Sequence, residues 1–290
     1  MRVSFEKRAY LTETGRRRPT EPMLRRLLDR VSLLRYNELF LYSGREPARL
    51  DPVFAGYAKM KGVEVVALDA GGLAAIRGEG AAEVSTEAPR SLAGRVEEMR
   101  ERMEAAEARG REKGVKRFLV TDFSDGLDWH SPIVSLPGMV MGGYFASIGA
   151  KAAKMDLERE LSQFLDAPMA GTLLKLGTLY LRGGARRDDS SEYFNILSND
   201  RGYSRHPGIT DFVLNEVSSI LRGIMADAER SLSRSETAKD ILYTALLLDA
   251  ACNRRNEARL KTAREEFVRM WNRHFEPGGR DMSVAKFPRF

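Results

Sequence analysis

The chain has 290 residues, of which 43% are hydrophobic and 30% are charged, so it can form one large or two modest globular domains of ordinary composition. No run approaches the roughly eighteen apolar residues of a membrane span, and the N-terminus lacks the apolar stretch of a signal peptide, so we expect a cytoplasmic protein with no membrane partner. The single cysteine, Cys252, excludes an intrachain disulfide and a cysteine-based metal cage, and no nucleic-acid-binding motif accompanies the net charge of +6.

Five segments in the first half of the chain have strand patterns. They are short, and several are rich in β-branched or aromatic residues. Residues 70–90 hold many Gly and Ala, so we expect an irregular link there that contains one of the five strands. The expected strands cover residues 8–13, 36–43, 63–68, 83–86 and 118–122.

Helical patterns separate most of these strands. Thr20 can cap a helix that has Pro22 in its first turn, and apolar residues then recur at helical spacing. Further helices are expected over residues 47–61 and from Leu92 to about Gly114. Short strands that alternate with helices predict parallel βαβ units, with helices on the outer face of the sheet.

The pattern changes after residue 138, where strand signals stop and helices follow one another. This change predicts an α/β domain over residues 1–145 and an α-helical domain over residues 146–290. The expected helices of the second part cover about 155–165, 169–182, 191–198, 209–232, 236–252 and 255–274.

The most specific motif is TDFSDGLDWHSPIVSLPG, residues 121–138. It resembles the last barrel strand and the following loop of the bacterial family 20 glycoside hydrolases, the β-N-acetylhexosaminidases. Their pattern runs roughly Thr-Asp-Trp-Gly-Asp, then His-Trp, then Val-Ser-Tyr-Pro-Gly. The residues in matching positions are Thr121, Asp122, Asp125, Trp129, Val134, Ser135, Pro137 and Gly138.

Weaker similarities to the same family follow in chain order. Residues 27–42, 62–66 and 91–95 resemble the first helix with the second strand, the third strand, and the loop after the seventh strand; residues 271–279 resemble part of the helical tail. The resemblance implies a partial TIM-like (β/α) barrel of about four to five parallel strands, followed by a helical domain. It also implies that the first, second, third and last strands lie side by side.

The catalytic segment of the family has no counterpart here. About twenty residues separate Asp69 from Arg90, where a family member has its strands four to seven. That segment carries an adjacent Asp-Glu pair, in which Glu is the general acid and Asp orients the acetamido group of the substrate. No Asp-Glu dipeptide occurs in this sequence. The resemblance therefore predicts a hexosaminidase-like protein without catalytic activity.

Three carboxylates are the remaining catalytic candidates, because glycoside hydrolysis needs a carboxylic acid and barrel enzymes place it where strands end. Asp69 ends the third predicted strand, Asp122 ends the last, and Asp125 follows it; Glu13 ends the first. The alternative is structural: Asp122 and Asp125 bond loop amides, and Asp69 ends a strand before a glycine-rich turn.

Five residues are candidates for substrate binding. Trp129 can stack on a pyranose ring and His130 can bond a hydroxyl; the alternative is that Trp129 packs under the loop and His130 is solvated. Asp128 shares their loop, and Phe123 stands at the family's last-strand Trp position. Arg16 matches the family's Arg after the first strand, with a slip of one residue.

No cofactor or metal is expected. Asp188, Asp189 and Glu192 cluster on a loop, but without a supporting His or Cys they are better explained as an acidic turn that caps a helix. The run Arg16–Arg18 and similar pairs can contact an anion or nucleic acid. A solvated basic surface is the favoured explanation, so we expect no nucleic-acid partner.

An incomplete barrel leaves two sheet edges and an apolar inner face that must be covered. The helical half can cover this face, or a second copy of the chain can. We expect the second, a homodimer in which two chains share the open face.

Two functions compete. The first is a non-catalytic protein that binds an amino sugar or acts as a scaffold. The second is an active glycoside hydrolase on N-acetylhexosamine-type sugars that uses Asp69, Asp122 and Asp125.

Overall fold

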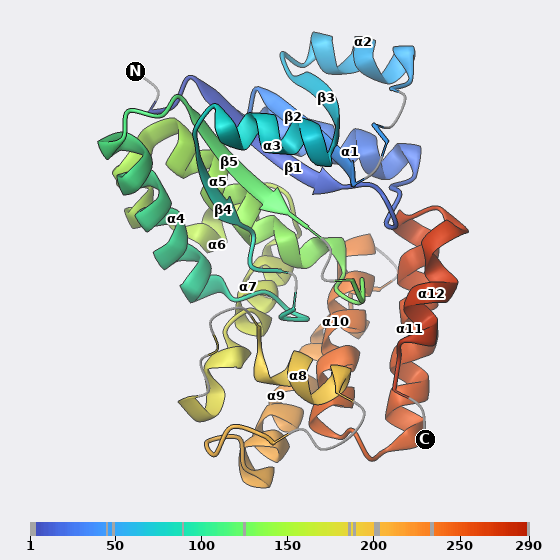
Figure 1. Cartoon of the computed structure of the whole chain (residues 1–290). Helices are drawn as coiled ribbons and strands as arrows, with labels where there is room; N and C mark the ends of the chain where they lie inside the picture. Colours follow the sequence, from blue (N-terminus) through green and yellow to red (C-terminus); the bar gives the residue numbers. More distant parts are fainter. Residues whose placement is uncertain are drawn as a thin grey trace. The chain divides into compact units, whose positions relative to one another are not determined.

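The computed structural model describes residues 4–44, 46–47, 50–88, 90–123, 126–184, 187, 190–199, 204–232 and 235–288 (Figure 1). The chain divides into two compact units. The first holds Met1–Thr86, Glu97–Ser124 and Pro137–Glu160, and the second holds Glu87–Val96, Asp125–Leu136 and Leu161–Phe290. Each unit is therefore built from segments that are discontinuous in the sequence.

The first unit contains one sheet of five parallel strands in the order β3-β2-β1-β5-β4. The last strand lies beside the first, with Thr12 opposite Asp122. The first and last strands of a closed barrel are neighbours in the same way. A parallel α/β sheet followed by helices confirms the predicted fold class. The strands are β1 (Lys7–Glu13), β2 (Glu38–Gly44), β3 (Glu64–Asp69), β4 (Ala81–Ser85) and β5 (Arg117–Asp122).

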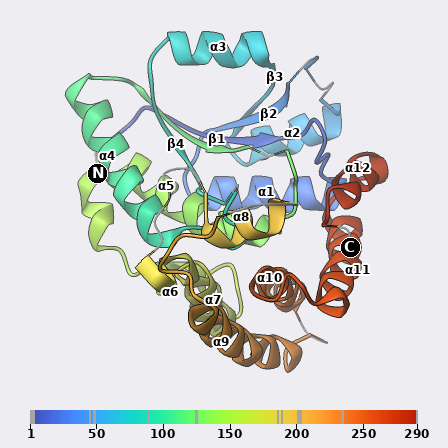
Figure 2. The same cartoon turned by 60° about the horizontal axis from the view of Figure 1, so that its bottom comes forward.

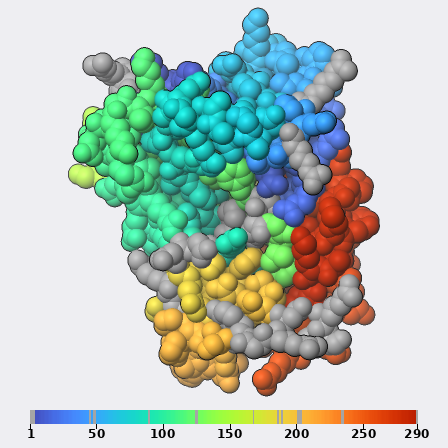
Figure 3. Space-filling view, viewed as in Figure 1, coloured from blue at the N-terminus to red at the C-terminus, as the bar shows by residue number. Residues whose placement is uncertain are grey.

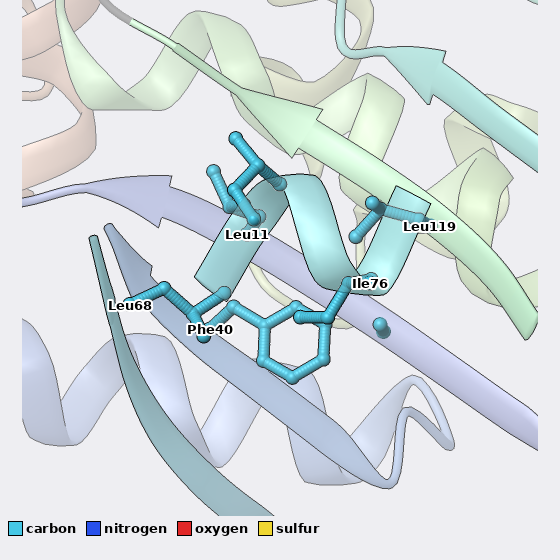
Figure 4. Packing of buried hydrophobic residues seen from close by; sticks show 7 residues of the cluster. Leu11, Phe40, Leu68, Ile76 and Leu119 are labelled. Atoms are coloured by element: carbon cyan, nitrogen blue, oxygen red, sulfur yellow. The ribbon is translucent and has the colours of Figure 1, made fainter. Parts of the chain in front are cut away.

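One face of the sheet is covered by a helix that the sequence analysis missed. The expected irregular link at 70–90 is wrong in its first part, because α3 (Ala70–Gly78) occupies its first nine residues. Leu73 and Ile76 of α3 pack on Leu11, Phe40 and Leu119 of three different strands (Figure 4). Figure 2 shows α3, in cyan, lying over these strands, and Figure 3 shows the outer surface of this cyan segment. This is the face that a closed barrel would keep as its interior.

The other helices of the first unit lie on the opposite face (Figure 2). Close backbone approach fixes α5 there: a Cβ added at Gly142 would lie 2.3 Å from Cγ2 of Val120 in β5. The hydroxyl of Tyr36, which precedes β2, donates to the carbonyl of Met139 over 2.7 Å. These helices are α1 (Glu21–Leu33), α2 (Pro52–Met60), α4 (Val96–Glu112) and α5 (Leu136–Ile148).

The helical stretch Pro132–Lys154, which includes α5, is apolar and long enough to cross a membrane by length and composition alone. Its mean hydropathy is 1.4, yet 83% of it is buried inside the structure. Burial of that extent is what a core helix of a folded protein shows. No other helix in the described ranges passes the same test.

The second unit is helical within the residues that the structure describes. α10 is its most buried long helix and packs against α9 and α11. The predicted helices at 191–198, 209–232, 236–252 and 255–274 are confirmed, with shifts of a few residues at their ends. The helix predicted at 169–182 ends at Leu176, and a 3-10 segment follows at Leu179–Gly184. The helices that follow α5 in the chain are α6 (Leu157–Leu161), α7 (Ala167–Leu176), α8 (Glu192–Ser198), α9 (Asp211–Glu229), α10 (Glu236–Cys252), α11 (Glu257–His274) and α12 (Arg280–Ala285).

Candidate functional site

The carboxyl ends of the five strands form the rim where barrel enzymes place their site. Asp69 ends β3 and Asp122 ends β5, while β2 and β1 stand between them. Three strand spacings of about 4.8 Å separate the two backbones by about 14 Å. The two carboxyl groups of a glycosidase lie only about 5–9.5 Å apart. Each carboxylate is also bonded elsewhere, that of Asp69 to the first turn of α3 and that of Asp122 to Tyr10 and Thr86, so the two do not form such a pair. Asp125 lies outside the described residues.

Asp122 is the centre of a small polar network. Its Oδ2 accepts a hydrogen bond from the hydroxyl of Tyr10 at 3.1 Å, and its Oδ1 accepts one from Thr86 at 3.0 Å. Burial, and then the nearby Asp122 charge, raise the pKa of Tyr10 well above its usual value, so its hydroxyl stays a donor. The network joins the middle of β1 to the residue after β4 and to the end of β5.

Asp69 begins the helix that covers the sheet. It is the N-cap of α3, and its Oδ1 accepts a hydrogen bond from the amide of Gly72 at 2.7 Å. Such a cap contributes about 1 kcal/mol to helix stability. The geometry gives Asp69 the structural role that the sequence analysis set against the catalytic one.

Phe123 and Tyr42 form an aromatic pair at the same rim. Their ring centroids are 5.4 Å apart with perpendicular planes, and both rings are half-buried against the core cluster under α3. The guanidinium carbon of Arg77 lies 5.9 Å from the Phe123 ring and its nitrogens bond Glu83. This pair is the one aromatic platform near the strand ends that the described rings provide.

Arg16 lies in the bend after β1 and is half-buried. The preceding Gly15 lies very close to β2, since a Cβ there would come within 2.6 Å of the carbonyl oxygen of Ser43. This contact places the loop that carries Arg16 beside the end of β2. The location agrees with a rim residue.

Trp129 belongs to the second unit and is fully buried there. Its Nε1 donates to the carbonyl of Ser283 at 3.2 Å, and its ring lies 4.8 Å from that of Phe287 and 6.5 Å from that of Phe194. The hydroxyl of Tyr243 donates to its carbonyl oxygen. A ring that stacks on a sugar must expose at least one of its faces to solvent. Trp129 exposes neither face in this structure.

Asp128 and His130 flank Trp129 and are buried as well, at 0% and 2% exposure. Asp128 adopts a positive φ of 62°, and its Oδ2 accepts a hydrogen bond from the hydroxyl of Ser283 at 3.3 Å. The loop 128–130 is therefore part of the packed interior of the second unit, and His130 is not solvated as the alternative supposed.

A metal site is not evident in the part of the chain that the structure describes, where no group of three or more His, Cys, Asp or Glu side chains could hold an ion. Asp188 and Asp189 lie outside the described residues. Glu192, the third member of that acidic cluster, is buried; it bonds Nε of Arg187 at 3.0 Å and the amide of His206 at 2.7 Å.

Sequence reasoning missed Tyr10, Thr86 and Tyr42 as rim residues. Tyr10 and Thr86 reach Asp122 from strands that are 112 and 36 residues away along the chain. The register that brings them together is not visible in one sequence. Tyr42 had a weak signal, because it stands near the end of a predicted strand, as Phe123 does.

Comparison with known proteins adds no family assignment. No protein-family model matches the chain, and the search of curated proteins finds no match.

Proposed function

We propose that this chain is a hexosaminidase-like protein that lacks glycosidase activity and binds an amino sugar. The observation that supports the first half is α3, which packs through Leu73 and Ile76 on the sheet face that the remaining strands of a closed barrel would enclose. With α3 in that position, the strands that would complete the barrel and present a catalytic pair at its rim have no counterpart in the sheet that the structure describes. The wide separation of Asp69 and Asp122 across the sheet supports the same conclusion.

The chemistry of Asp122 points the same way. A general acid must carry a proton before it can transfer one to the leaving oxygen. Both carboxylate oxygens of Asp122 accept hydrogen bonds, from Tyr10 and Thr86, and such bonds stabilise the ionised form. Asp122 is therefore suited to hold strands together rather than to donate a proton.

An activity assay tests the catalytic half of the proposal. We expect the pure protein to release no chromophore from aryl N-acetylhexosaminides above the enzyme-free rate. The competing glycosidase hypothesis predicts turnover that disappears in Asp69→Asn, Asp122→Asn or Asp125→Asn. Stoichiometric release of amino sugar by a homogeneous preparation, abolished by any of these changes, would overturn the proposal.

The binding half rests on the aromatic pair Tyr42 and Phe123, because carbohydrate sites use aromatic rings beside polar groups and both rings are partly exposed. We expect N-acetylglucosamine to shift the NMR signals of these two rings at millimolar concentration. Phe123→Leu keeps the packing volume and removes the ring, so it should weaken binding about fivefold to tenfold.

The control for that titration is Phe212→Leu, since Phe212 is 77% exposed on α9 and far along the chain from the rim. It should leave the affinity unchanged. Equal effects of the two substitutions, or shifts confined to other residues, would show that the rim does not bind the sugar.

A further inference from the structure

A groove of about 1140 Å³ lies within the second unit. It is bounded by α8, the N-terminus of α9, the turn after α10 and the N-terminus of α11. Its apolar side is formed by Ile196, Leu214 and Ala251, all of them buried. The volume matches the upper end of small-molecule sites, about 1000 Å³.

Arginine dominates the charge of this groove. Arg205, Arg254 and Arg255 line it against two carboxylates, Asp211 and Glu257, which leaves a formal net charge of +1. The hydrogen bond from Arg205, 2.7 Å long, lowers the pKa of Asp211. Asp211 is therefore ionised, and its negative charge offsets the positive charge of Arg205. Arg255 is exposed at the groove, where it can meet a ligand.

Two helix N-termini meet at the same groove. Thr210 caps α9 by accepting from the amide of Val213 at 3.3 Å, and Asn256 caps α11 by accepting from the amide of Arg259 at 3.2 Å. Each helix N-terminus carries about half a positive elementary charge, and the C-terminus of α10 opposes one of them. The helix dipoles thus add to the positive field of the arginines.

The turn between α10 and α11 supplies neutral hydrogen-bonding groups beside these charges. Asn253 and Asn256 line the groove from this turn, and Asn215 lines it from α9. The side-chain nitrogen of Asn253 already donates to Ser218 and Asp249, so the amide groups offered to a ligand are those of Asn215 and Asn256. Side-chain amides next to arginines can bond the hydroxyl or ester oxygens of a ligand whose anionic group the arginines hold.

We propose that this groove binds a small molecule that carries a phosphate group. A phosphate presents several charged oxygens to arginine and to helix N-termini, and the apolar and amide surfaces leave room for an organic part. The site is independent of the sheet rim and of any glycosidase activity.

Calorimetric titration tests the proposal with three probes: inorganic phosphate, a hexose phosphate, and the same hexose without phosphate. We expect both phosphates to bind and the free hexose not to bind. Tighter binding of the hexose phosphate than of inorganic phosphate would identify a phosphate ester as the ligand, and equal binding would identify phosphate itself. Binding of the free hexose as tight as that of its phosphate would overturn the proposal.

Arg255→Gln and Arg264→Gln form a matched pair of variants. Both arginines are exposed, Arg255 just before α11 and Arg264 within it. Of these two, Arg255 lines the groove and Arg264 does not. Arg255→Gln should weaken phosphate binding about tenfold, the loss expected for one charge-assisted hydrogen bond, and Arg264→Gln should leave it unchanged. Equal weakening in both folded variants would mean general electrostatic attraction and would refute the site.

Discussion

Tyr10 and Asp122 show what a single hydrogen bond between distant strands does in this sheet. Tyr10→Phe removes the donor and leaves the buried side of the carboxylate with one partner fewer. We expect the free energy of unfolding to fall by about 1–2 kcal/mol, measured by urea denaturation. Tyr42→Phe is the control, because the Tyr42 hydroxyl makes no hydrogen bond within the described residues; a loss as large as that of Tyr10→Phe would contradict the assignment.

Asp240 is a buried charge whose partners outweigh its burial. Burial alone would raise its pKa, but hydrogen bonds and charges from His274 and Arg273 lower it below the usual value. The distances are 2.8 Å to Nε2 of His274 and 2.8 Å to Arg273. A carboxyl with a lowered folded pKa stabilises the protein above its unfolded pKa, and this contribution is lost as the pH falls through the folded pKa.

Asp240→Asn should therefore lower the free energy of unfolding at pH 7 by about 3 kcal/mol, since it leaves Arg273 and His274 without the carboxylate that they contact. Its stability should also depend less on pH than that of the unmodified protein below about pH 4. Urea denaturation at several pH values measures both effects. Asp211→Asn removes an exposed carboxylate whose ion pair with Arg205 is screened by solvent, so both effects should be much smaller there. The role of Asp240 would be refuted if the unmodified protein and Asp240→Asn showed the same dependence of stability on pH.

At the scale of elements, α5 depends on glycine for its contact with the sheet. Gly142→Ala would place a methyl group 2.3 Å from Cγ2 of Val120 and 2.6 Å from the Tyr36 hydroxyl. We expect a loss of about 1–3 kcal/mol in unfolding free energy from overpacking. Thermal or urea denaturation measures it.

Gly56→Ala is the matched control within a helix. Gly56 is exposed on α2, and an added Cβ would have no neighbour within 4 Å. The helix propensity of Ala should stabilise the protein by about 0.5–1 kcal/mol there. Opposite signs for the two substitutions are expected; stabilisation by both would mean that α5 does not pack as closely as the structure shows.

Two of the helices that sequence reasoning missed, α3 and α5, share one property. α3 reads AGGLAAIRG, with three glycines and two buried apolar residues, and α5 is apolar nearly all around. Neither has the amphipathic stripe that identifies a surface helix. They are helical because tertiary burial outweighs weak local propensity, and a single sequence does not reveal that burial.

At the scale of the whole molecule, the homodimer prediction loses its main physical reason, because α3 already covers the apolar sheet face. Strands β3 and β4 still end the sheet as its two outer strands. Light scattering at high micromolar concentration checks the oligomeric state: one chain has a mass of 32.6 kDa, and a dimer has twice that. If the protein is a dimer, we expect the edge strands β3 or β4 to form its interface rather than the sheet face under α3.

Local patterns in the sequence were sufficient to predict most strands and helices and the change from α/β to all-α structure, because each rests on residues within a few positions of one another. Long-range contacts were needed to show that α3 fills the inner face, that Asp69 and Asp122 stand three strands apart, and that Trp129 is buried. Those features join residues separated by tens to hundreds of positions, and their positions follow from packing that only the folded chain creates.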